Sequence, residues 1–197
     1  MSKKFFLSIL LVAAFYFLNA QTTKFDSTLK MNDVGYRIIC NNKKTDRNDV
    51  TIRLLGFKDN NHDLNVSIIG TLHKAIIDDF NDDGNPDLVF YSFDDNQIAQ
   101  VYALASVNNK SYAPIYMTDI YINSKLREGY QGHDEFSAMG GYLIRKYPIY
   151  QTDSTTKTTT VMGTRVVEYK AKSNSENPNP DHPTYKFEVF KSYDLKP

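Results

Sequence analysis

An acidic segment lies between two short apolar runs near the middle of the chain, and it reads Ile76-Ile77-Asp78-Asp79-Phe80-Asn81-Asp82-Asp83-Gly84-Asn85-Pro86-Asp87-Leu88-Val89-Phe90. The apolar runs are rich in β-branched and aromatic residues and are too short to form helices. Asp, Asn and Gly are the residues that tight turns prefer. The sequence therefore predicts a β-hairpin with an acidic tip.

The spacing of oxygen-bearing side chains in this tip matches a calcium loop. Counted from Asp79 as position 1, oxygens fall at positions 1, 3, 5 and 9, Gly84 stands at the bend, and residue 85 can offer its backbone carbonyl. Position 12 is Phe90 instead of the glutamate of an EF-hand, so we expect a hairpin loop with a structural Ca²⁺. The expected ligands are Asp79, Asn81, Asp83, Asn85 and Asp87. A metal-free turn is the alternative, but the crowding of four carboxylates favours a bound cation.

The first residues of the chain indicate export. Lys3 and Lys4 precede an uncharged apolar run over residues 5–18, and Ala20 offers a cleavage site. This pattern is typical of a secretory signal peptide over residues 1–20, and the run is shorter than the roughly 20 residues of a membrane span. We expect a periplasmic or secreted protein without stable membrane insertion; an uncleaved anchor is the alternative.

The composition excludes a nucleic-acid-binding surface. Without Lys3 and Lys4, the 23 basic residues become 21 against 23 acidic ones, a net charge of −2. The single cysteine, Cys40, forms no internal disulfide and is expected to face a core.

The rest of the chain predicts an all-β domain. Residues 21–33 are polar and are expected to form a flexible leader, and residues 34–197 a single antiparallel β-sandwich or open barrel. Strands are expected over residues 34–40, 50–57, 65–72, 99–105, 142–150, 164–170 and 185–193. Residues 115–122 are either extended or one helical turn.

Three segments of the second half carry a family resemblance. The first contains Gly129-Tyr130-Gln131-Gly132-His133-Asp134-Glu135-Phe136, the second spans residues 141–150, and the third begins with Gly163-Thr164-Arg165. Their succession after an acidic loop resembles the periplasmic inhibitors of invertebrate-type (i-type) lysozyme. The resemblance implies a small exported β-sandwich that blocks lysozyme by inserting a loop into its cleft, without catalysis of its own. The chain departs from the family in carrying Val161-Met162 before Gly163.

Lysozymes cleave with a pair of carboxylates, so an inhibitor needs hydrogen-bond donors on a stiff loop. We expect Tyr130, His133 and Arg165 to supply these donors. The glycines would allow close approach of the backbone. The expected partner-binding set is Gly129, Tyr130, Gly132, His133, Asp134, Glu135, Gly163, Thr164 and Arg165. The alternative is structural: residues 133–135 form an internal network, and Arg165 pairs with Glu168 or Asp134.

Nothing in the sequence points to an enzyme. His133 and Glu135 lack a third spaced ligand for zinc, and no nucleophile motif or phosphate-binding glycine loop is present. A second hypothesis is a calcium-dependent adhesion or glycan-binding β module, and a homodimer also stays open.

Overall fold

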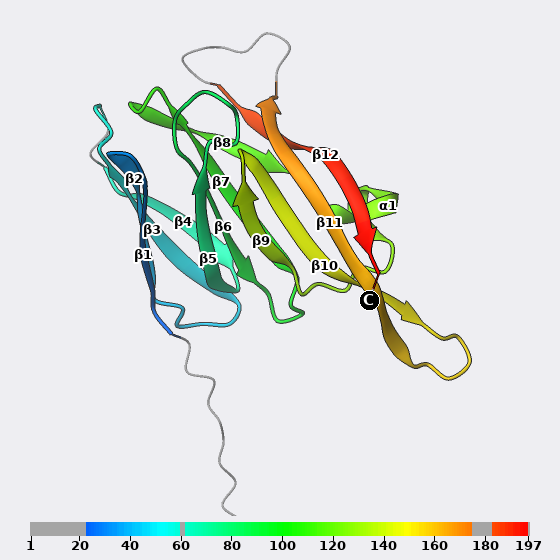
Figure 1. The fold of residues 1–197 in the computed structure, drawn as a ribbon. Coiled ribbons are helices and arrows are strands. Elements are labelled where there is room, and N and C mark those ends of the chain that lie inside the picture. Colours follow the sequence, from blue (N-terminus) through cyan, green and yellow to red (C-terminus); the bar gives the residue numbers. More distant parts are fainter. Residues whose placement is uncertain (1–22, 60–61, 175–182, 197) are drawn as a thin grey trace, which may run out of the picture.

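The computed structural model describes residues 23–59, 62–174 and 183–196. The fold is almost entirely β, with a two-sheet sandwich in which the larger sheet is a nearly closed barrel, so the all-β prediction is confirmed (Figure 1). The strands of the described residues are β1 (Phe25–Met31), β2 (Val34–Cys40), β3 (Arg47–Leu55), β4 (Leu64–Ile69), β5 (Thr71–Asp78), β6 (Asp87–Phe93), β7 (Ala99–Val107), β8 (Ser111–Met117), β9 (Glu135–Met139), β10 (Tyr142–Thr152), β11 (Thr159–Ser173) and β12 (Tyr185–Leu195). A 3-10 turn, η1 (Ile120–Ile122), and a single helical turn, α1 (Ser124–Arg127), follow β8.

The strands form a small sheet in the order β1-β2-β3-β4 and a large sheet in the order β5-β6-β7-β8-β12-β11-β10-β9. Neighbouring strands are antiparallel except β8 and β12, which pair in parallel over three residues. At the other side of the barrel, Lys74 Nζ on β5 donates to the Phe136 carbonyl on β9 at 3.1 Å. This bond links the two edge strands of the large sheet.

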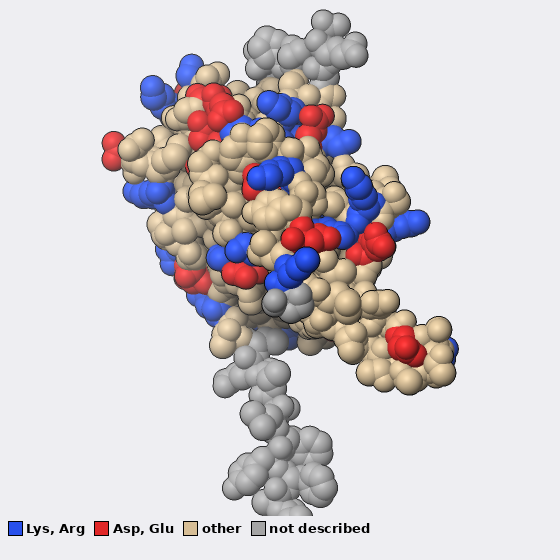
Figure 2. All heavy atoms as spheres, turned by 45° about the vertical axis from the view of Figure 1, so that its right-hand side comes forward, with Lys and Arg blue, Asp and Glu red and all other residues tan. Residues whose placement is uncertain are grey.

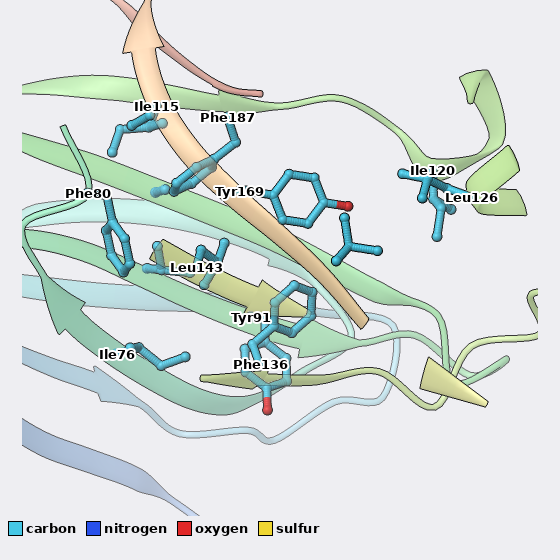
Figure 3. Packing of buried hydrophobic residues seen from close by; sticks show 14 of the residues in the cluster. Ile76, Phe80, Tyr91, Ile115, Ile120, Leu126, Phe136, Leu143, Tyr169 and Phe187 are labelled. Atoms are coloured by element: carbon cyan, nitrogen blue, oxygen red, sulfur yellow. The ribbon is translucent and has the colours of Figure 1, made fainter. Parts of the chain in front are cut away.

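Strand β6 is buried on both faces and therefore lies between two hydrophobic cores. Val89 and Tyr91 point into the barrel, where they pack with residues such as Phe136 and Leu143 (Figure 3). Leu88 and Phe90 instead pack against the small sheet. A strand covered on both sides is apolar at successive positions, which explains the uninterrupted run after Asp87.

Most strand predictions are confirmed, with shifted ends. The strand expected over residues 65–72 is wrong as a single element, because Gly70 takes a positive φ of 76° and divides it into β4 and β5. Both alternatives for residues 115–122 occur, since β8 ends at Met117 and η1 follows. Strand β9 was not predicted.

The prediction of a flexible leader over residues 21–33 is wrong for Phe25–Met31. These residues form β1, which pairs with β2 along its whole length. Phe25, Leu29 and other alternate residues are half-buried, whereas Asp26 and Lys30 are exposed. Ser27, a polar residue on the half-buried face, interrupts this alternation in the sequence.

The predicted signal peptide, residues 1–20, lies outside the described residues. Within the described ranges, no helix has the length and apolar character needed to cross a membrane. Cys40 is buried in the core beneath the small sheet, as predicted.

Candidate functional site

The β10–β11 hairpin projects from the barrel beyond the ends of the neighbouring strands (Figure 1). β9 pairs with β10 only as far as Lys146, and β12 pairs with β11 only from Thr164 onward. Beyond these points the two strands pair with each other, and residues 151–162 are all exposed. Asp153 and Lys157 are the charged residues among them. On the face of the molecule seen in Figure 2, basic and acidic residues are interspersed.

Hydrogen bonds within the chain order the tip of this hairpin. The Asp153 carboxylate accepts from the backbone amides of Thr155 and Thr156 at 2.8 and 2.7 Å. The amide of Thr156, followed by that of Thr155, holds the pKa of Asp153 below its usual value. Lys157 takes the left-handed conformation, with φ of 59°. The tip is therefore a defined turn that presents Lys157 and several threonine hydroxyls to solvent.

The predicted donor Tyr130 is buried and belongs to an internal network. Its hydroxyl donates to Asp134 Oδ2 at 2.5 Å and accepts from Arg145 Nη2 at 3.0 Å. Arg145 Nε donates to Asp134 Oδ1 at 2.6 Å, and its guanidinium lies among the rings of Tyr130, Phe136 and Tyr147. Burial raises the pKa of the Tyr130 hydroxyl. These contacts favour the structural alternative for Tyr130 and Asp134.

Arg165 is also occupied within the protein. Its guanidinium binds both carboxylate oxygens of Asp194 at 2.7 and 3.0 Å. Nη1 donates to the carbonyls of Lys125, Leu126 and Glu128 at the end of α1. The expected partners Glu168 and Asp134 are thus replaced by Asp194, and Arg165 fastens α1 to the end of the barrel.

The glycines of the predicted set allow close approach within the chain itself. A Cβ on Gly129, whose φ is 70°, would lie 2.6 Å from Ile149 Cγ2 and 2.8 Å from the Tyr150 carbonyl oxygen. A Cβ on Gly132 would lie 2.3 Å from the Gln97 carbonyl oxygen, and one on Gly163 would lie 2.5 Å from that of Leu195.

The remaining members of the predicted set differ in exposure. His133 and Glu135 are exposed, and Thr164 is half-buried within β11. The structure therefore assembles residues 129–135 and 163–165 near one end of the barrel, but it turns most of their donors inward.

The acidic loop between β5 and β6 folds around its own carboxylates. Asp79 accepts from the amides of Asp83 and Gly84 at 3.0 and 2.8 Å. Asp83 accepts from the backbone amide and the side-chain amide of Asn85 at 2.8 and 3.0 Å. Asn81 Nδ2 donates to Asp83 Oδ2 at 3.1 Å. The loop is thereby wound tightly about residues 79 and 83.

Asp87, at the end of this loop, is fully buried. Its two oxygens accept from the amides of Phe80 and Ser106 at 2.9 and 3.0 Å. Burial, followed by repulsion from the Asp83 carboxylate, raises the pKa of Asp87 to about 8. A cation beside these carboxylates would reverse the repulsion.

Among the described ion pairs, the one between Lys170 and Asp82 brings a cation to this region. The buried Lys170 ammonium lies 2.6 Å from Asp82 Oδ1 and donates to the Gly141 carbonyl at 2.9 Å. Lys170 therefore neutralises Asp82, which is outside the predicted ligand set, and leaves Asp79, Asp83 and Asp87 without a basic partner among the described ion pairs.

The loop fits calcium in its donor chemistry, because carboxylate, amide and carbonyl oxygens are the ligands that Ca²⁺ takes. The placement of the described side chains, in contrast, does not form a metal site. In the part of the chain that the structure describes, no group of three or more His, Cys, Asp or Glu side chains is placed to hold a metal ion. Occupation of the loop would thus require its carboxylates to converge further on the ion.

Sequence reasoning missed Arg145, Lys170 and Asp194. Each forms an ion pair with a residue at least 11 positions away in the chain. Arg145 and Lys170 stand at buried positions inside predicted strands. For Arg145 the available signal was a charged residue directly after the apolar run Tyr142-Leu143-Ile144.

Comparison of the chain with protein-family models, with curated proteins and with solved structures found no match in any of the three.

Proposed function

We propose that the protein is an exported, non-enzymatic binding protein that inhibits a lysozyme by inserting the β10–β11 hairpin into the enzyme's cleft. The projecting, fully exposed hairpin carries the proposal, because it is the part of the described chain with the shape of an inserted loop. The lysozyme target rests on the sequence resemblance of residues 125–136, 141–150 and 163–170. Export rests on the signal-peptide pattern of residues 1–20.

The chemistry of the hairpin tip suits a carboxylate-lined groove. Lys157 can approach the carboxylates with which lysozymes cleave, and the hydroxyls of Thr155, Thr156 and Thr158 can donate hydrogen bonds. The Asp153 carboxylate is directed to the amides of its own turn, so it is engaged inside the loop. A turn ordered before binding loses less conformational entropy on association. This assigns the contact to residues 153–158 in place of Tyr130 and Arg165.

The proposal is tested with a peptidoglycan-lysis assay in which the chain from Gln21 onward is titrated against i-type, c-type and g-type lysozymes. We expect inhibition of one class. Lys157→Ala should weaken that inhibition, while Lys146→Ala, which removes an exposed lysine of β10 on the body of the barrel, should leave it unchanged. Lysis at the uninhibited rate for all three classes, with folded protein, would overturn the proposal.

A second variant separates the hairpin from the rest of the fold. Replacement of residues 151–160 by Asn-Gly keeps the Tyr150–Val161 pair and closes it with a two-residue turn. We expect inhibition to disappear while the melting temperature changes little, because these residues are exposed and pair with no other strand in the described chain. Full inhibition by this variant would remove the hairpin from the mechanism.

Calcium is proposed as a structural ion in the Asp79–Asp87 loop, and not as part of the contact with lysozyme. β9 starts beside β7 and ends beside the acidic loop, so the loop and the Tyr130–Asp134 segment lie at opposite ends of the barrel. Inhibition should therefore respond to a chelator only through the stability of the domain.

A further inference from the structure

A cavity of about 200 Å³ opens at the end of the barrel where β7 begins and η1 follows β8. Its lining combines polar and aromatic side chains from four parts of the chain. Those that the argument uses are Gln100, Thr118, Asp119, Tyr121, Tyr130 and Arg145. None of its lining residues belongs to the exposed end of the β10–β11 hairpin, residues 151–162, so the cavity is separate from the surface assigned to lysozyme.

The floor of the cavity is a rigid polar network. The side chain of Arg145 is only 4% exposed and is fixed by Asp134 on one side and by the Tyr130 hydroxyl on the other. Because each of these groups is held by the others and by the surrounding rings, the floor has one arrangement before any ligand arrives. Preorganised polar groups of this kind fix the orientation of a small ligand.

The rim carries an aromatic face. Tyr121 is half-exposed, and its ring meets that of Tyr130 edge to face at 5.7 Å between centroids. The backbone amide of Tyr121 donates to Asp119 Oδ1 at 2.9 Å, which holds the turn that carries the ring. Half-buried Gln100 and Thr118 add an amide and a hydroxyl to the wall.

The size of the cavity, about 200 Å³, suits a ligand of a single ring. It is smaller than the roughly 300–1,000 Å³ of pockets for drug-sized ligands.

The charges of the lining favour a neutral ligand. Arg145 is neutralised by Asp134, and the exposed carboxylate of Asp119 at the rim repels anions. The guanidinium carbon of Arg145 lies 5.1 Å from the centre of the Tyr130 ring, so this ring already has a cation beside it. The side chains of Gln100 and Thr118 can donate and accept hydrogen bonds, and the carboxylate of Asp119 can accept them.

From these features we infer that the cavity binds one pyranose ring of a neutral sugar. The apolar face of the ring packs on Tyr121, and its hydroxyls exchange hydrogen bonds with Gln100, Thr118 and Asp119. The Arg145–Asp134–Tyr130 network forms the base on which the ring rests. This site is independent of the proposed inhibition of lysozyme.

The test is saturation-transfer NMR on the full mature chain with N-acetylglucosamine, glucose and galactose as probes and glucuronate as the charged comparison. We expect transfer to at least one neutral sugar at about 10 mM, since single-ring ligands bind with millimolar Kd. Tyr121→Ala and Gln100→Ala should each weaken binding about tenfold, the loss expected for one stacking or hydrogen-bonding contact. Tyr116→Ala, which removes an exposed tyrosine of β8 outside the cavity, is the matched control.

The proposal is overturned by any of three results: no transfer to the three neutral sugars, stronger transfer to glucuronate, or equal binding by all three variants. Thermal melts of the variants establish that they are folded. Because both Gln100 and Tyr121 are tested, loss of fold in one variant leaves the other to decide.

Discussion

The side chains of Asp134 and Asp87 are both buried, one at each end of the barrel, but their charges are compensated by different groups. The Asp134 side chain receives the guanidinium of Arg145 and the hydroxyl of Tyr130. Asp87 receives two backbone amides and faces further carboxylates. Burial of a charge is costly unless a partner compensates it. Asp134 is thus compensated by an ion pair, whereas Asp87 has no basic partner among the described ion pairs and can be compensated by a proton or by an external cation.

The largest expected change in stability is at the end of the barrel that contains Asp134. Asp134→Ala leaves the Arg145 guanidinium buried without its counter-charge, which should lower the free energy of unfolding by about 3–5 kcal/mol. Urea denaturation measures this change. The control is Glu135→Ala, which removes an adjacent but exposed carboxylate and should stay within about 0.5 kcal/mol of the parent. A small loss for Asp134→Ala would show that water compensates Arg145.

At the uncompensated end, we expect stability to depend on pH. The pKa of Asp87 is raised to about 8 in the folded chain, so between pH 4 and 8 the folded state binds a proton that the unfolded state has lost. Stability should therefore fall as pH rises through this window, by a few kcal/mol at about 1.4 kcal/mol per pKa unit.

Urea denaturation in the presence of chelator, at intervals between pH 4 and 9, measures this dependence. Asp87→Asn should flatten the dependence of stability on pH, because the asparagine does not titrate. The variant also loses one of the two hydrogen bonds from backbone amides, since asparagine has a single acceptor oxygen. An unchanged profile in this variant would mean that other groups set the pH dependence.

Calcium should stabilise the end of the barrel that contains Asp87. An ion bound to the Asp79–Asp87 loop replaces the proton on Asp87, so binding should release protons near neutral pH. At a hundredfold excess over Kd, the gain in stability is about 2.7 kcal/mol. Differential scanning calorimetry with calcium and with chelator measures the gain, and Asp83→Asn should reduce it. Identical melts in both conditions would contradict calcium binding.

The elements that could be predicted from the sequence are those that local patterns determine. The acidic loop and its flanking strands were predictable because turn residues, β-branched runs and ligand spacing are all local patterns. β6 was also predictable, because a strand that is buried on both faces is apolar at successive positions. β1 was not predicted, because polar Ser27 on its half-buried face interrupts the apolar alternation, and its pairing with β2 is not a local pattern.

The candidate donors illustrate the limit for side chains. The sequence shows that Tyr130 and Arg165 carry donors but not where those donors point. Their partners Arg145 and Asp194 lie 15 and 29 residues away in the chain and are brought close by strand pairing. Register between distant strands decides such contacts, and local patterns do not encode it. The projecting hairpin was missed for the same reason, since its projection depends on where β9 and β12 stop pairing.

The smallest expected effect concerns the second arginine–aspartate pair. Asp194 is half-exposed, and Arg165 keeps its bonds to the carbonyls at the end of α1 when the carboxylate is removed. Asp194→Asn should therefore lower the free energy of unfolding by only about 0.2–1 kcal/mol. The hydrogen bond from Arg165 lowers the pKa of Asp194, so this contribution is present above the ordinary pKa of an aspartate and disappears as pH falls through the lowered value. Parent and variant should therefore become equally stable in acid, and added salt should narrow their difference at neutral pH. A loss as large as that of Asp134→Ala would show that exposure does not distinguish the two pairs.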